Sequence, residues 1–108
     1  PFTIEFTVRG YLPTRYAEIA RFLDLPAGDE PQAAASLAAA IRDLAGRIGQ
    51  PTSLRGAGIS PEQFEANLEP LIDKAFNDSA MTVTARFPEE EELEQVLRCL
   101  YDGRSVDC

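Results

Sequence analysis

The most constraining stretch of the sequence is a helix start at residues 60–63. Ser60 can accept a hydrogen bond from the amide of Gln63, and Gln63 can reach back to the amide of Ser60, which is the capping-box arrangement. Pro61 falls at the first helical position, where its missing N–H costs nothing. The stretch therefore predicts a helix over residues 61–76, with a kink or break at Pro70, which cannot donate to the preceding turn. Its apolar stripe consists of Phe64, Leu68, Leu71, Ile72, Ala75 and Phe76.

Three further stretches predict helices. The stretch from residue 29 to 48 begins with Asp29 and Gln32 placed for a second capping box, and its alanine-rich face lets a neighbouring helix approach closely. The stretch from 88 to 103 opens with four glutamates, which suit the positive end of the helix dipole, and it ends at a glycine. The predicted inward faces are Tyr16, Ile19, Ala20 and Leu23 in residues 13–23; Ala34, Leu37, Ala38, Ile41, Leu44, Ala45 and Ile48; and Leu93, Val96, Leu97, Leu100 and Tyr101.

The two ends of the chain do not show this helical period. In residues 1–10 apolar and polar side chains alternate, as they do in a half-buried strand, but no second strand of equal quality is present to pair with it. The alternatives are a strand and the worn end of a longer element. Residues 104–108 are predicted to form a loose tail. The expected fold class is all-α, a bundle of four to five helices that forms one domain over residues 1–108. Residues 1–10 are the part of this domain that can be extended.

Charge and composition exclude several classes of function. The chain of 108 residues carries 18 acidic and 10 basic side chains, a net charge of −8, which opposes binding to a nucleic-acid backbone. No apolar run approaches the ~20 residues that span a bilayer. Histidine is absent, which removes imidazole as a metal ligand or general base. Two cysteines, Cys99 and Cys108, make no disulfide framework and indicate reduced thiols in a cytoplasmic protein.

Features that resemble chemical motifs are better interpreted as structural ones. The acidic run at residues 89–92 is a solvated helix start, and Gly56-Ala57-Gly58 lacks the strand and third glycine of a dinucleotide-binding loop, so it is a turn. The serines have no histidine to activate them. Cys99 lies in the last helical pattern and is interpreted as a core thiol. The residues themselves therefore assign no catalytic, cofactor-binding or metal-binding group.

The order and spacing of longer segments resemble a known family. The segments Arg15–Leu25, Ala39–Ile59, Phe64–Ala80 and Glu92–Asp107 are similar to the C-terminal end of the iron-type (group III) alcohol dehydrogenases, in particular the alcohol dehydrogenase half of the bifunctional acetaldehyde/alcohol dehydrogenases. The opening Pro1–Thr7 resembles the family segment Pro-Tyr-Val-Ile-Glu-Phe-Asn, which closes the helix after the last metal-ligand histidine. The resemblance thus implies a helix end at residues 1–7.

The resemblance implies an NAD(P)-dependent oxidoreductase that interconverts alcohols and aldehydes. In that family an N-terminal α/β part binds the cofactor, and a helical C-terminal part holds a divalent metal, iron or zinc, through an aspartate and three histidines. This chain begins after the last of those ligands, and its abrupt start at Pro1 favours a fragment. The implied expectation is a segment with no cofactor or metal site of its own and no activity when isolated. Its partners would be the remainder of a cytoplasmic, homo-oligomeric dehydrogenase.

One family motif falls within the chain. The motif Cys-Thr-x-x-Asn-Pro-Arg lies near the family's substrate cleft, and this sequence has Ala80-Met81-Thr82-Val83-Thr84-Ala85-Arg86 in its place. The resemblance therefore implies that Ala80 and Arg86 lie at the edge of the cleft, although only Arg86 matches the motif. This divergence indicates an altered substrate choice, or a stand-alone helical packing or oligomerisation module derived from a dehydrogenase tail.

Overall fold

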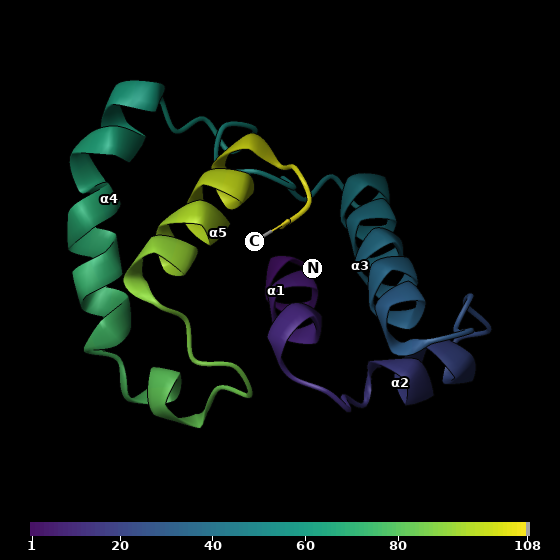
Figure 1. Ribbon diagram of the computed structural model, residues 1–108. Helices are drawn as coiled ribbons and strands as arrows, with labels where there is room; N and C mark the ends of the chain where they lie inside the picture. The colour runs from purple at the N-terminus through teal and green to yellow at the C-terminus, as the bar shows by residue number, and fades with distance from the viewer. Residues whose placement is uncertain (108) are drawn as a thin grey trace.

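The computed structural model describes residues 1–107, and within this range it is built from helices without a strand (Figure 1). The all-α prediction is therefore confirmed. Helix α1 lies in the middle of the molecule, where it contacts α3 on one side and α5 on the other; α2 packs on α3, and α4 packs on α5. The elements are α1 (Phe2–Gly10), α2 (Tyr16–Phe22), α3 (Glu30–Arg47), α4 (Pro61–Phe76), the 3-10 helix η1 (Ser79–Val83) and α5 (Glu90–Asp102).

The N-terminal segment is the helix α1, so the prediction of an extended segment within residues 1–10 is wrong, and the helical conformation that the family resemblance implies for residues 1–7 is observed over Phe2–Gly10. Three successive residues of α1, Phe6, Thr7 and Val8, are buried, which a helix between two neighbours allows and a strand with one wet face does not. A helix also satisfies its own backbone hydrogen bonds, whereas a lone strand would leave its N–H and C=O groups without partners.

Helix α4 begins as the sequence predicts. Ser60 Oγ accepts from the Gln63 amide at 3.2 Å, and Gln63 Oε1 accepts from the Ser60 amide at 2.9 Å. The predicted break at Pro70 does not occur, because the helix runs unbroken from Pro61 to Phe76. Pro70 lies on the exposed side, away from the buried face that packs on α5. That face consists of Phe64, Leu68 and Ile72.

Tyr101 of α5 closes the core between the last two helices. Its ring stacks on Phe64 with the centroids 4.4 Å apart, and its hydroxyl donates to the Ile59 carbonyl at 3.2 Å. Gly103 ends α5 with a φ of 75°, a left-handed conformation that glycine adopts without steric cost. The predicted end of this helix is thus confirmed.

The pair formed by α2 and α3 packs through alanines. Ala17, Ala20 and Ala33 are buried with almost no exposed surface, which confirms the close approach expected from small side chains. The predicted inner face of α2 is partly wrong, because Ile19 and Leu23 are exposed while Ala17 is buried.

The start of α3 is capped by one of the two predicted bonds. Asp29 Oδ1 accepts from the Gln32 amide at 2.8 Å. The Gln32 side chain accepts from the Gly28 amide instead of the Asp29 amide, so the second half of the predicted capping box is absent.

The C-terminal segment is held against α1, so the prediction of a loose tail is wrong for residues 104–107. Val106 is 1% exposed and packs with Phe6 and Cys99. Its amide donates to Glu5 Oε2 at 3.0 Å, and its carbonyl accepts from Arg9 Nε at 3.1 Å. One buried valine and two long-range hydrogen bonds thus fix a tail that its polar composition did not predict. Cys108, the other part of that prediction, lies outside the described residues.

Candidate functional site

The segment that the family resemblance places at the cleft edge joins α4 to α5. Asp78 begins its 3-10 helix by accepting from the Ala80 amide at 2.8 Å. The Ala80 side chain is exposed, and Met81 turns partly inward. The structure therefore places Ala80 on the outer surface of this segment.

Arg86 connects the same segment to both α1 and α5. Its Nη1 donates to the Phe6 carbonyl at 2.5 Å, its Nη2 pairs with the Glu92 carboxylate, and its guanidinium lies 3.8 Å from the centre of the Phe6 ring. The side chain is only 16% exposed. Arg86 therefore fixes residues 79–87 against α1. The position of Ala80 and Arg86 at the edge of a substrate cleft stays a prediction.

Gly10 at the end of α1 leaves the space that Arg86 occupies. A Cβ at this position would lie 2.6 Å from Arg86 Nε and 2.9 Å from its Cζ, closer than such atoms approach. Any larger residue would push the guanidinium away from its partners. Sequence reasoning missed Gly10, because a glycine at a helix end has an ordinary conformational explanation.

A cavity of about 130 Å³ lies beside Arg86, between α1, the segment 79–88 and α5. Its walls are mostly apolar and include Phe6, Met81, Leu93 and Val96. Ligand pockets usually enclose about 300–1,000 Å³, so this cavity alone is too small for a substrate with its cofactor. The cavity brings Arg86, which the family motif placed at the cleft edge, next to Phe6. The only sequence feature that pointed to Phe6 was the alternating apolar pattern of residues 1–10.

A second polar cluster fixes α1 against α3 and the tail. Arg42 donates to both carboxylate oxygens of Glu5, at 2.5 and 2.9 Å, and the Val106 amide donates to the same carboxylate. Burial raises the pKa of Glu5, whereas the hydrogen bonds from Arg42 and Val106 lower it, and the lowering prevails. Glu5 is therefore ionised and fully engaged at neutral pH, and it is a structural anion rather than an acid catalyst.

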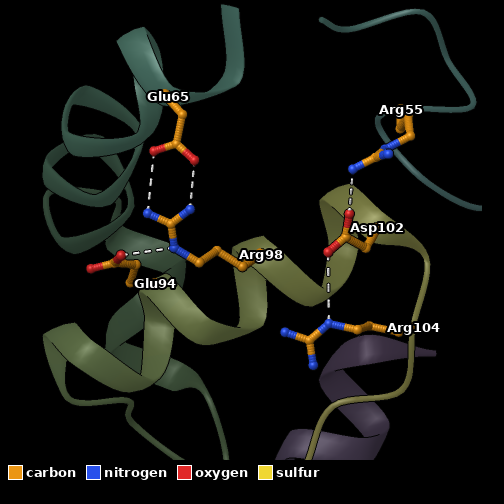
Figure 2. A network of polar contacts seen from close by, with 6 residues as sticks. All are labelled: Arg55, Glu65, Glu94, Arg98, Asp102 and Arg104. Atoms are coloured by element: carbon orange, nitrogen blue, oxygen red, sulfur yellow. Dashed lines mark hydrogen bonds and ion pairs between the residues drawn. The ribbon is translucent and has the colours of Figure 1, made fainter. Parts of the chain in front are cut away.

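A third set of charges joins α5 to α4 and to the loop that precedes α4 (Figure 2). Arg98 donates to both carboxylate oxygens of Glu65, at 2.6 and 3.2 Å, and this pairing raises the pKa of the Arg98 guanidinium. These side chains are at least 39% exposed, so each pair adds little to stability, and the set orients α5 against its neighbours. The other ion pairs drawn join Arg98 to Glu94, and Asp102 to Arg55 and Arg104.

The remaining candidate features have structural roles. The Glu89 amide donates to Glu92 Oε2 at 2.9 Å in a capping box, and this bond comes first among the causes that lower the pKa of Glu92. Gly56-Ala57-Gly58 forms the predicted turn, and Cys99 is buried in the core as predicted. Within residues 1–107, no three His, Cys, Asp or Glu side chains gather as they would around a metal ion. No helix in this range is long and apolar enough to cross a membrane.

Comparison with known proteins identifies the family. A sequence model described as "Fe-containing alcohol dehydrogenase family, C-terminal" matches residues 1–101. The chain therefore belongs to the Fe-containing alcohol dehydrogenase family and corresponds to its C-terminal part. The helical fold is compatible with that assignment.

Named relatives support the same assignment. The chain is 39% identical over 92 residues to the bifunctional aldehyde-alcohol dehydrogenase AdhE of Escherichia coli (strain K12). This match covers 83% of the chain and 10% of that protein. It is 26% identical over 107 residues to the NADPH-dependent butanol dehydrogenase of Clostridium saccharobutylicum, covering 99% of this chain and 27% of that protein. It is 31% identical over 104 residues to an alcohol dehydrogenase of Thermococcus barophilus, covering 94% and 25%. The chain thus spans between a tenth and about a quarter of these relatives.

Proposed function

We propose that this chain is the C-terminal helical segment of an NAD(P)- and metal-dependent alcohol dehydrogenase, in which it supports the metal site and closes one wall of the substrate cleft. The observation that carries the proposal is the anchoring of residues 79–87 on α1 through Arg86, the one residue that matches the family motif of the cleft. The names of the relatives, an NADPH-dependent butanol dehydrogenase among them, support the reaction class.

The residues of this chain would position other groups rather than react. Arg86 holds the cleft segment on α1, and the Glu5–Arg42 pair holds α1 on α3, so the two elements keep a fixed relation. In the whole enzyme a divalent metal would polarise the alcohol or aldehyde oxygen, while NAD(P) would exchange the hydride. As the family resemblance implies, the metal ligands and the cofactor site would lie in the remainder of a homo-oligomeric enzyme.

A second candidate function is a stand-alone packing or oligomerisation module. Two observations favour it. The motif residues other than Arg86 are replaced, and several large apolar side chains are exposed, Phe22 at 88% among them. A module of this kind would need no cofactor and would act through those exposed side chains.

The test uses the natural reading frame that contains Pro1–Cys108, expressed in full. We expect the purified protein, loaded with Fe²⁺ or Zn²⁺, to oxidise NADH or NADPH when an aldehyde is added. Arg86→Met should lower kcat/KM by about 10- to 100-fold through misplacement of the cleft segment, while Arg86→Lys should retain more activity. A truncated version of the same polypeptide that stops before Pro1 is the comparison. Full activity of that truncated version would contradict the proposal and favour the packing module.

A further inference from the structure

The tail at residues 104–107 turns back from the end of α5 to α1 (Figure 1), where it contacts the side of the helix that carries Glu5 and Arg9. These two residues are four positions apart, so they are neighbours on the helix surface. The Val106 amide donates to Glu5 Oε2 at 3.0 Å, and the Val106 carbonyl accepts from Arg9 Nε at 3.1 Å. One residue of the tail is therefore attached to α1 at two points along the helix.

Arg86 contacts the adjoining side of the same helix. Its Nη1 donates to the Phe6 carbonyl at 2.5 Å, and its guanidinium lies over the Phe6 ring. Its side chain also occupies the space beside Gly10. Phe6 and Gly10 each follow a residue bound by the tail by one position, which is about 100° further around the helix. The tail and Arg86 thus hold two adjoining sides of one stretch of α1.

Phe6 belongs to both contacts. With Cys99 and Val106 it forms one buried cluster, in which Val106 is among the most completely buried side chains of the described residues. The Phe6 ring also receives the guanidinium of Arg86, with 3.8 Å between the guanidinium carbon and the ring centre. Protein interiors are packed about as densely as organic crystals, so a void at Val106 would let Phe6 and its stretch of helix shift. A shift of Phe6 would move the ring and the carbonyl that Arg86 binds.

The segment of residues 79–87 depends on Arg86 because much of the rest of the segment is exposed. Val83 is 82% and Phe87 is 58% exposed, whereas the Arg86 side chain is 16% exposed. Arg86 also pairs with Glu92 of α5, so it joins the segment to two helices at once. Displacement of α1 would therefore loosen the best buried attachment of the segment.

We propose that Val106 is a positioning residue for residues 79–87 and acts on them through Phe6 and Arg86. The docked tail holds α1 where the Phe6 carbonyl and ring receive Arg86, and Arg86 in turn holds the segment. The inference rests on the proposed function in one respect, because it is the proposed function that puts residues 79–87 at a substrate cleft. Val106 would then influence the reaction without contacting the substrate.

The test is a double-mutant cycle between Val106→Ala and Arg86→Met in the natural polypeptide that contains Pro1–Cys108. Amide hydrogen exchange over residues 79–87 measures how firmly the segment is held, and kcat/KM for aldehyde reduction measures the effect on the reaction. Arg9→Met is a second way to loosen the tail, because it removes the hydrogen bond to the Val106 carbonyl. The control is Phe64→Leu, which truncates the separate core cluster that α4 forms with Tyr101.

We expect Val106→Ala to speed exchange over residues 79–87 by about tenfold, because two buried methyl groups are lost, and Arg9→Met to act in the same direction. Phe64→Leu should leave exchange in this segment unchanged. In the Arg86→Met background, Val106→Ala should change the exchange rate by less than about twofold and lower kcat/KM no further, because the connection from tail to segment is already cut. A merely structural loss would instead add to that of Arg86→Met.

An undiminished effect of Val106→Ala in the Arg86→Met background would overturn the inference. Unchanged exchange over residues 79–87 in both Val106→Ala and Arg9→Met would also overturn it. If Val106→Ala does not fold, the same cycle with Arg9→Met decides the question. A polypeptide in which the exchange rates are coupled as expected but no aldehyde is reduced would contradict the proposed function alone, and the connection from Val106 to residues 79–87 would stand.

Discussion

Replacing Leu68 by alanine tests which face of α4 lies in the core. Leu68 is 6% exposed, lies one turn from Phe64 and Ile72, and belongs to the cluster closed by Tyr101. Burying a leucine contributes about 1.5–3 kcal/mol, and the cavity left by truncation adds to that loss. We therefore expect Leu68→Ala to lower the free energy of unfolding by about 2–5 kcal/mol.

Leu71 provides a matched control on the same helix. It is 40% exposed, so solvent fills the space that truncation leaves and only part of the transfer term is lost. We expect Leu71→Ala to cost about 0.5–1.5 kcal/mol. Glu91→Ala, in the exposed first turn of α5, should cost at most about 0.3–1 kcal/mol, because the lost dipole interaction is offset by relief of repulsion between neighbouring glutamates.

The assay is urea denaturation followed by helical circular dichroism, with the slope required to stay constant among the variants. For a domain of this size, each kcal/mol also shifts the thermal midpoint by about 4–8 °C, which gives a second readout. Equal midpoints for Leu68→Ala and Leu71→Ala would refute the assigned face of α4. A larger loss for Leu71→Ala would mean that the helix is rotated toward that side.

Further expected outcomes concern the polar clusters, the cap of α4 and the exposed apolar side chains. Glu5→Gln should destabilise the chain at neutral pH. Because the pKa of Glu5 is lowered on folding, its contribution exists above the ordinary value of 4.5 and disappears as pH falls below it, so the wild-type and variant melting temperatures should converge in acid. Ser60→Ala should cost about 0.5–2 kcal/mol by removing the cap of α4, and an unchanged melting temperature would contradict this. The 108-residue chain should self-associate through its exposed large apolar side chains, and a clean monomer at tens of micromolar would contradict that expectation. Calorimetric titration of the chain with Zn²⁺, Fe²⁺ or NADH should show no micromolar site.

Helix starts and ends were predictable because they depend on local chemistry. The capping residues of α4 and the glycine that ends α5 act over four or five positions, so the sequence contains their whole explanation. Pro70 shows the limit of local reasoning. Its missing amide removes one hydrogen bond, but the buried residues on either side hold the helix together, and that packing is not visible in the local sequence.

The burial of the stripes was only partly predictable, because it depends on which neighbours are present. Helical spacing predicts one inward face along the whole of α3, but this prediction is wrong for the second half of the helix, where Ile41, Leu44 and Ile48 are exposed. In α1 the alternating pattern suits a strand, and contacts with two helices override it. The family motif identified Arg86, whereas its partners come from α1 and α5, some 80 and 6 residues away along the chain.

The buried position of Val106 has a consequence for synthesis. Its hydrogen bonds to Arg9 and Glu5 join groups 97 and 101 residues apart, nearly the full length of the chain. Arg9 of α1 is synthesised 97 residues before Val106, so α1 leaves the ribosome before its own contacts can be complete. Until then Phe6 and Cys99 lack the valine that covers them. Residue 106 therefore has to be synthesised before this core can close, and until then α1 lacks part of its cover.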